Sequence, residues 1–170
     1  KTVTLASSDI NRGYVDFTVT KSDLGADGSK SLTAKITDVA GNVGAASGAV
    51  AFTLDTTSPT TTVSTVAFSA DTGVAGDFIT KTAAQTISGT LSATVAAGET
   101  VFVSIDNGST WSAATTTVGA NTWTIAKTLT ASSTLQVKVT DTAGNDGAIY
   151  SQAFTLDTTS PTTTVSTVAF

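Results

Sequence analysis

Short runs of alternating apolar and polar side chains, separated by turn residues, extend over residues 61–156. In the clearest run Leu135, Val137 and Val139 alternate with polar neighbours. A period of two buries one face of a strand and leaves the other face in water. The same pattern predicts seven strands, at residues 61–68, 85–93, 101–105, 111–118, 122–126, 135–139 and 149–156. The chain is therefore expected to be all-β, with two packed sheets.

An internal repeat sets the expected domain organisation. Residues 51–68 and 153–170 have the same sequence, AFTLDTTSPTTTVSTVAF. A repeat of about 100 residues is the size of a self-contained β-sandwich. We therefore expect residues 1–54 to be the C-terminal part of one module, residues 55–156 a complete module, and residues 157–170 a linker and the first strand of a third module.

The first, partial module is expected to share the fold of the complete one. The motif Asp-x-Ala-Gly-Asn follows LTAKIT in the first module and LQVKVT in the second. Strands are predicted at residues 3–5, 14–20, 32–37 and 49–54, and residues 21–31 are expected to form a loop without a counterpart in the complete module. Residues 1–54 would then supply only part of a sandwich.

Composition narrows the class of function. More than one residue in five is Thr, a β-branched residue that suits strands. The chain has no His and no Cys, so Ser-His-Asp and Cys-His catalysis and the usual zinc sites are excluded. The net charge of −5 argues against nucleic-acid binding. No apolar run is long enough to span a membrane as a helix. We expect a protein that is not an enzyme.

Asp accounts for all the acidic residues except Glu99, and it clusters in loops. In a seven-stranded antiparallel sandwich, alternate loops lie at opposite ends. This places Asp55 beside Asp141 and Asn145 at one end, and Asp71 and Asp77 beside Asp157 at the other. Carboxylates crowded together repel each other unless a cation such as Ca²⁺ is bound. In the loop 141–145, Asp followed by Gly-Asn also favours a simple tight turn, held by bonds from side chain to backbone.

The segment Ser104–Trp111 reads SIDNGSTW, the Ser-x-Asp-x-Gly-x-Thr-Trp pattern of a structural hairpin turn. Asp106 is expected to cap the turn, and Gly108 to supply a positive φ. Trp111 and Trp123 are expected to be core or half-buried residues rather than platforms for sugars.

The segments LDTTSPTTTVS, SADTGVAGDFIT, ISGTLSATVAAGETVFVSIDNGSTW and TDTAGN together resemble bacterial Ig-like repeats of large type I-secreted (RTX-type) adhesins, including biofilm-associated proteins. The resemblance implies an immunoglobulin-like β-sandwich at the extracellular bacterial cell surface. It also implies a spacer role in cell adhesion and biofilm formation, with neighbouring repeats in contact end to end and with Ca²⁺ as cofactor. The metal ligands that it implies are Asp55, Asp71, Asp77, Asp141, Asn145 and Asp157, with Asp38 and Asn42 in the first module.

Two other functions are compatible with the sequence. A carbohydrate- or protein-binding module would present an exposed aromatic patch, with Trp111 or Trp123 in contact with its ligand. A filament or surface-layer subunit would associate laterally with copies of itself through its strands. End-to-end contact alone is the arrangement expected of a spacer.

Overall fold

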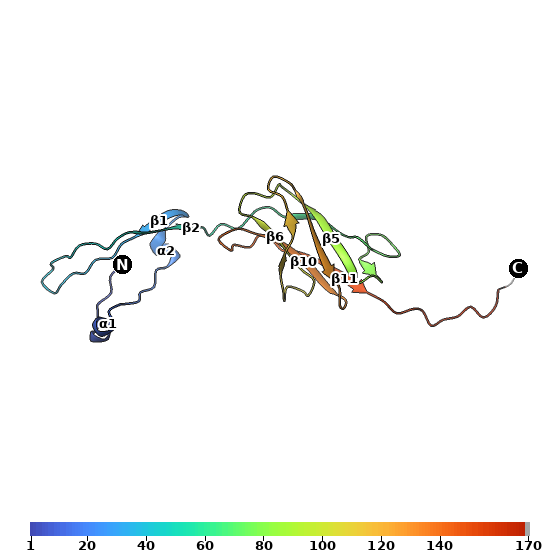
Figure 1. The fold of residues 1–170 in the computed structure, drawn as a ribbon, viewed down its shortest axis with the longest axis horizontal. Helices are drawn as coiled ribbons and strands as arrows, with labels where there is room; N and C mark the ends of the chain where they lie inside the picture. The colour runs from blue at the N-terminus through green and yellow to red at the C-terminus, as the bar shows by residue number, and fades with distance from the viewer. Residues whose placement is uncertain (169–170) are drawn as a thin grey trace. The chain divides into compact units, whose positions relative to one another are not determined.

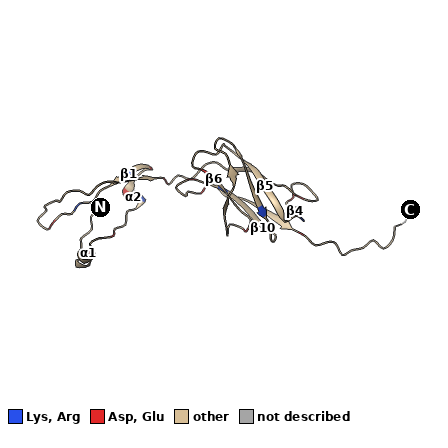
Figure 2. Ribbon diagram, in the orientation of Figure 1, with Lys and Arg blue, Asp and Glu red and all other residues tan. Residues whose placement is uncertain are grey.

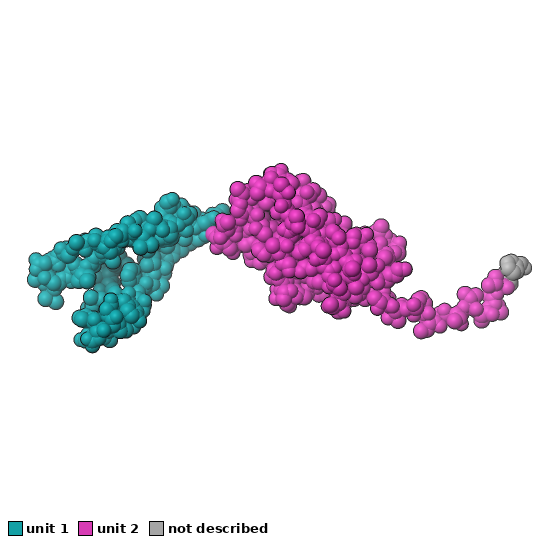
Figure 3. Space-filling model, viewed as in Figure 1, with its two compact units in different colours: residues 1–57 teal, residues 58–170 magenta. Residues whose placement is uncertain are grey.

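The computed structural model describes residues 1–168. The chain separates into two compact units, residues 1–57 and the residues from Ser58 onward (Figure 3). Each unit is described by itself below.

The second unit folds as two β-sheets (Figure 1). Its strands are β3 Val63–Phe68, β4 Ile79–Thr80, β5 Ala84–Leu91, β6 Thr100–Ser104, β7 Ser112–Ala113, β8 Thr115–Thr116, β9 Thr122–Thr128, β10 Ser133–Thr140 and β11 Tyr150–Leu156. One sheet has the order β4-β11-β10-β6-β7 and the other the order β3-β5-β9-β8. Every pair of neighbours is antiparallel except β4 and β11, which are parallel.

One apolar core is shared by the two sheets, as the alternation of apolar residues predicts. Leu135, Val137 and Val139 of β10 are at most 1 % exposed, whereas Gln136 and Lys138 between them are half-buried. The other buried apolar side chains of the core are Phe68, Phe78, Ile87, Leu91, Val95, Val101, Val103, Trp123, Leu129 and Phe154. Each fully buried Val, Leu or Phe stabilises the fold by about 1.5–3 kcal/mol. The all-β, two-sheet prediction is confirmed.

Two details of the strand prediction are wrong. The single strand expected at residues 111–118 is divided into β7 in the five-stranded sheet and β8 in the four-stranded sheet. Between them the backbone N–H of Ala114 donates to the carbonyl of Val101 at 2.8 Å. The chain crosses from one sheet to the other at this point, and two residues per sheet are too few to give a periodic signal. The second difference is β4, where no strand was expected.

The first unit has two short helices and one pair of strands. Its elements are α1 Ser7–Arg12, α2 Lys21–Leu24, β1 Gly28–Leu32 and β2 Val50–Leu54. The strand pair β1–β2 runs antiparallel from Gly28 opposite Leu54 to Leu32 opposite Val50. The bridge between Thr37 and Val43 matches the bridge between Thr140 and Asp146 in the second unit. The hairpin β1–β2 is therefore the counterpart of β10–β11.

The strand prediction for the first unit is confirmed only at residues 49–54. Residues 3–5 and 14–20 are not strands, α2 and β1 occupy the segment expected as a loop, and the ladder of β1 ends at Leu32 rather than continuing to Thr37. A strand needs a neighbour to satisfy its backbone donors and acceptors. Within the first unit only β1 and β2 provide one.

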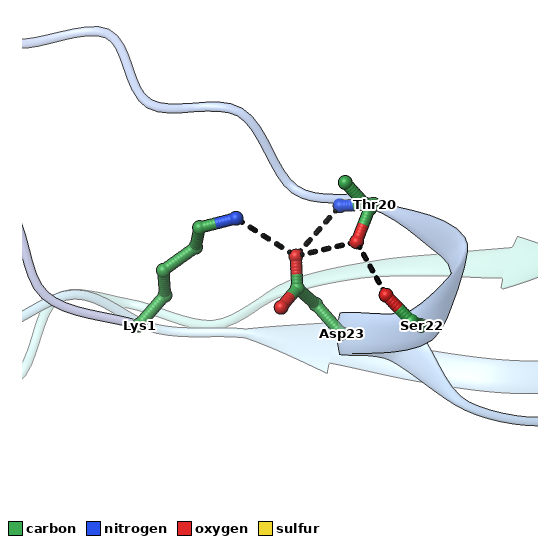
Figure 4. A network of polar contacts seen from close by, with 4 residues as sticks. All are labelled: Lys1, Thr20, Ser22 and Asp23. Carbon is green, nitrogen blue, oxygen red and sulfur yellow. Dashed lines mark hydrogen bonds and ion pairs between the residues drawn. The ribbon is translucent and has the colours of Figure 1, made fainter.

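Local polar contacts order the start of α2 (Figure 4). Asp23 Oδ2 accepts hydrogen bonds from the backbone N–H and the hydroxyl of Thr20, each at 2.8 Å, and from Nζ of Lys1 at 2.9 Å. These bonds, led by the backbone N–H of Thr20, hold the pKa of Asp23 well below its usual range. The helix is thus fixed by an N-terminal cap and not by an apolar face.

The first unit lacks a core of its own. None of residues 1–57 is buried, and large apolar side chains such as Tyr14 and Phe17 are at least half exposed. An isolated strand pair is marginal in water because few apolar groups offset the loss of chain entropy.

We therefore expect residues 1–54, produced alone, to show no cooperative thermal transition by circular dichroism, whereas residues 55–156 melt cooperatively. A sharp melt of the shorter fragment would contradict this expectation.

Charged residues are sparse along the ribbon (Figure 2). Among residues 1–168, no helix is both long enough and apolar enough to cross a membrane.

Candidate functional site

The loop at residues 141–145 is closed by one carboxylate. Asp141 Oδ1 accepts hydrogen bonds from the backbone N–H groups of Ala143 and Asn145, each at 2.9 Å, and Oδ2 accepts one from Asn145 Nδ2 at 2.9 Å. The Asn145 side chain is the main cause of the lowered pKa of Asp141. The tight-turn interpretation of this loop is therefore confirmed, while a metal role for Asp141 and Asn145 stays a prediction.

The same motif gives the same geometry in the first unit. Asp38 Oδ1 accepts from the backbone N–H groups of Ala40 at 2.9 Å and Asn42 at 2.8 Å, and Oδ2 accepts from Asn42 Nδ2 at 2.9 Å. The pKa of Asp38 is lowered, again mainly by the Asn42 side chain. Because the two units differ in burial, this agreement shows that the five-residue motif itself sets the loop.

The 141–145 loop lies beside the linker that precedes β3, as expected. The backbone N–H of Gly147 donates to the carbonyl of Val139 at 2.8 Å, and a Cβ at position 147 would lie 3.0 Å from the carbonyl oxygen of Pro59. Asp55 belongs to the first unit. A shared cluster of Asp55 with Asp141 and Asn145 therefore stays a prediction.

The loop between β3 and β4 is organised around Asp71. Asp71 Oδ2 accepts hydrogen bonds from the backbone N–H groups of Gly76 at 2.7 Å and Phe78 at 3.4 Å. Asp71 Oδ1 is buried and has no hydrogen-bond partner. A buried polar atom without a partner costs about 1–3 kcal/mol, and more when the group is charged. The loop therefore contains one buried carboxylate oxygen whose hydrogen-bonding capacity is unused.

The same loop also carries backbone strain. Phe78 has a φ of 57°, in the left-handed region that bulky residues rarely adopt. Its ring is buried and packs edge-on against Phe68, with centroids 5.2 Å apart. Packing of the ring into the core thus holds the strained backbone in place. Strain of this kind gathers at ligand sites and switch regions.

Strand β4 brings this loop to the end of the module from which the chain leaves. Asp77 Oδ1 accepts from the backbone N–H of Ile79 at 2.8 Å. Next along β4, the carbonyl of Thr80 accepts from the backbone N–H of Asp157 at 2.9 Å. Asp157 thus lies beside Thr80, the last residue of β4, whereas Asp77 precedes β4 and in the parallel register is level with Ala153 and not with Asp157. Among the described residues no three Asp or Glu side chains gather as a metal-binding group, so Ca²⁺ binding by this set stays a prediction.

The turn at residues 104–111 is held as the sequence predicts. Asp106 Oδ1 accepts from the Ser104 hydroxyl at 2.6 Å and from the backbone N–H of Thr110 at 2.9 Å. These contacts, led by Ser104, lower the pKa of Asp106 to about 2. Gly108 has a φ of 84°, and a Cβ there would lie 2.7 Å from Gln136 Oε1. The Asp106 carboxylate thus accepts its hydrogen bonds from residues of the turn itself.

Sequence reasoning missed a cluster on the outer face of β10. Lys138 Nζ lies 4.4 Å from the centroid of the Trp111 ring and donates to Asp146 Oδ2 at 2.6 Å. This bond is the main cause of the lowered pKa of Asp146. The alternation along β10 indicated that Lys138 faces outward, but nothing in the sequence indicated which ring it would meet.

Neither tryptophan is an open platform for a sugar ring. Trp123 is 1 % exposed, and Lys138 lies over the ring of the half-buried Trp111. The prediction that both residues are core or half-buried is confirmed.

Two sheets of mainly antiparallel strands over one shared core define an immunoglobulin-like β-sandwich. A model of the bacterial Ig-like domain family matches residues 57–158, more than half of the 170-residue chain, and the chain belongs to this family. Bacterial Ig-like domains are typically extracellular and associated with the cell surface. No curated protein matches the sequence.

Proposed function

We propose that this chain is a spacer segment of a large bacterial surface adhesin, in which Ig-like modules follow one another end to end and Ca²⁺ stiffens the junctions. The role is structural and not enzymatic. The observation that carries it is the repetition of one junction sequence, residues 51–68 and 153–170, at both ends of a module with a closed core. Identical junctions allow modules to be added without a change of interface.

The rival functions have less support. A carbohydrate-binding module is disfavoured by the burial of Trp123 and by Lys138 over Trp111. A laterally assembled filament would need long, regular edge strands. Here β4 and β7 have two residues each, as does β8, and the β3 edge is interrupted by a register shift between Val63 and Thr65.

The Ca²⁺ part of the proposal is supported by the loop of Asp71. Its buried Oδ1 has no protein partner, and a carboxylate oxygen is a ligand that Ca²⁺ prefers. Asp71, Asp77 and Asp157 are the residues that would hold the ion at this end of the module. A bound ion would supply the missing positive charge and cross-link the loop to the linker that follows β11. Asp55, Asp141 and Asn145 would act at the other end, with Asp38 and Asn42 as their counterparts in the preceding module.

The test is a tandem protein of two copies of residues 55–156 joined directly, which regenerates the natural junction because residues 157–170 repeat residues 55–68. Ca²⁺ at about 100 times its Kd would stabilise each site by about 2.7 kcal/mol. We expect Ca²⁺ to raise the melting temperature by several degrees over the chelated protein. The maximum dimension in small-angle scattering should also increase, because a restrained linker holds the modules apart.

Matched variants assign the effect to the loop. Asp71→Asn should remove most of the Ca²⁺-dependent stabilisation at the junction. Glu99→Gln removes the same charge beside the opposite loop, where Gly98 lies close to Thr142, and should retain the effect. If Ca²⁺ changes neither the melting temperature nor the maximum dimension of the tandem protein, Ca²⁺ does not stiffen the junction. Concentration-dependent lateral association would favour the filament.

A further inference from the structure

The linker that follows β2 is held by a carboxylate from outside the linker. Asp27 Oδ2 accepts hydrogen bonds from the backbone N–H of Thr56 at 2.9 Å and from the hydroxyl of Thr57 at 2.8 Å. Asp27 Oδ1 accepts from the hydroxyl of Thr56 at 2.8 Å, and Lys21 Nζ donates to the same hydroxyl. One carboxylate thus receives three donors from two consecutive linker residues.

Strand register explains why Asp27 reaches the linker. In the β1–β2 ladder Gly28 is opposite Leu54, so Asp27 is opposite Asp55, one step beyond the ladder. In the second unit Ser133 is opposite Phe154. Continuing that register places Thr130 opposite Asp157. By this count of register Thr130 is the counterpart of Asp27, but residues 131 and 132 form a bend before β10, and there the Ser132 hydroxyl contacts the backbone of Leu156.

The two linkers have the same sequence but different contacts. In each, the Asp carboxylate closes a local turn: Asp55 Oδ1 accepts from the backbone N–H of Thr57 at 3.0 Å, and Asp157 Oδ1 from that of Thr159 at 2.9 Å. This turn follows from the linker sequence itself. In the described part of the chain, the hydroxyls of Thr158 and Thr159 make no hydrogen bond, unlike those of Thr56 and Thr57.

We propose that Asp27 is a positioning residue that anchors the linker following its own repeat, and that the residue at this register position decides whether a repeat holds that linker. A repeat with Asp there restrains the two threonine hydroxyls. In the second unit, with Thr there, the linker keeps its local turn and the bond from the Asp157 N–H to the Thr80 carbonyl, and the two threonine hydroxyls are not held. The stiffness of a junction would then depend on the type of the preceding repeat even where the linkers are identical. This consequence rests on the proposed spacer function, but the anchoring contacts do not depend on Ca²⁺.

The first test measures backbone motion in the complete 170-residue chain, without Ca²⁺, by ¹⁵N heteronuclear NOE. Asp27→Ala should lower the values at Thr56 and Thr57 to those of a mobile linker, while the amide shifts of Ser29 and Ser31 report that the hairpin remains. Asp16→Ala, which removes the same charge from an exposed position, should change neither value. Equal values in the two variants would overturn the proposal.

A pH titration distinguishes anchoring from a general loss of order. The bonds to Asp27, with the backbone N–H of Thr56 foremost, lower its pKa to about 2. A depressed pKa means that the contact is present above the unfolded-state pKa of about 4 and is lost as pH falls through about 2. The Thr56 amide shift should follow this titration, with a midpoint near pH 2. A midpoint near 4 would count against the contact.

The second test transfers the anchor. Thr130→Asp places a carboxylate at the matching position of the module that has a core, and it should raise the heteronuclear NOE of Thr158 and Thr159. Thr130→Asn, which is similar in size and uncharged, should raise it less. Unchanged values in Thr130→Asp would overturn the assignment of junction stiffness to this position. This result is independent of the test of the spacer proposal, because that test measures how Ca²⁺ changes the maximum dimension of the tandem protein.

Discussion

Gly89→Ala should destabilise the second module by about 3 kcal/mol or more, at the upper end of the usual cost of overpacking. A Cβ at position 89 would lie 2.1 Å from the carbonyl oxygen of Thr65 and 2.6 Å from Cζ2 of the Trp123 ring. Neither neighbour can move easily. Thr65 belongs to β3, which pairs with β5, and Trp123 lies opposite Gly89 in the β5–β9 ladder and is fully buried.

Urea unfolding of residues 55–156, followed by circular dichroism, measures this effect. Thr86→Ala on the same strand is the control, because Thr86 is exposed, and it should change the free energy of unfolding by about 0.5 kcal/mol or less. If Gly89→Ala and the parent module have the same urea midpoint of unfolding, β3 and Trp123 do not lie as close to Gly89 as described.

Trp123→Ala should cost about 3–5 kcal/mol, because it removes the largest side chain of the core and leaves a cavity. Small domains have a total stability of about 5–15 kcal/mol, so this variant should be close to unfolding at room temperature. Trp123 Nε1 is buried and has no hydrogen-bond partner. Trp123→Phe should therefore cost much less than Trp123→Ala, since it keeps most of the apolar volume and removes the unpaired N–H group.

Trp111→Ala is the matched comparison on the outer face. Its ring is half-buried and contacts the Lys138 ammonium, a kind of contact worth about 0.5–1 kcal/mol at exposed sites. The same urea titration should rank the three variants in the order Trp123→Ala, Trp123→Phe and Trp111→Ala, from most to least destabilised. If Trp111→Ala lowers the free energy of unfolding more than Trp123→Ala does, the assignment of Trp123 to the core and Trp111 to the surface is wrong.

The sequence predicted the parts of the fold that depend on local pattern. Alternation in residues 135–139 identified both the strand and its buried face, and SIDNGSTW identified a turn with Gly108 in the left-handed region. The motif Asp-x-Ala-Gly-Asn contains its own hydrogen-bonding groups, so the loops at Asp38 and Asp141 follow from five residues each. These features use contacts between residues that are close in the chain.

The first unit shows where local pattern fails. Residues 14–20 alternate like a strand, but the unit offers them no partner strand, and β1 and β2 pair only with each other. An amphipathic strand forms when a second sheet covers its apolar face, and that cover is absent from residues 1–57. The alternation of residues 14–20 therefore indicated a preference for a strand, but no partner strand or covering sheet is present in the first unit to stabilise one.

The candidate sites divide in the same way. The sequence by itself determined that the Asp-bearing loops lie at the ends of the module, because alternate loops of an antiparallel sandwich must do so, and it determined the repeat and the absence of His and Cys chemistry. Only the tertiary structure decided that Asp71 Oδ1 is buried without a partner, that Lys138 lies over Trp111, and that Asp27 rather than Thr130 holds a linker. Each of these facts depends on distances between segments far apart in the chain, which are fixed by strand register and core packing.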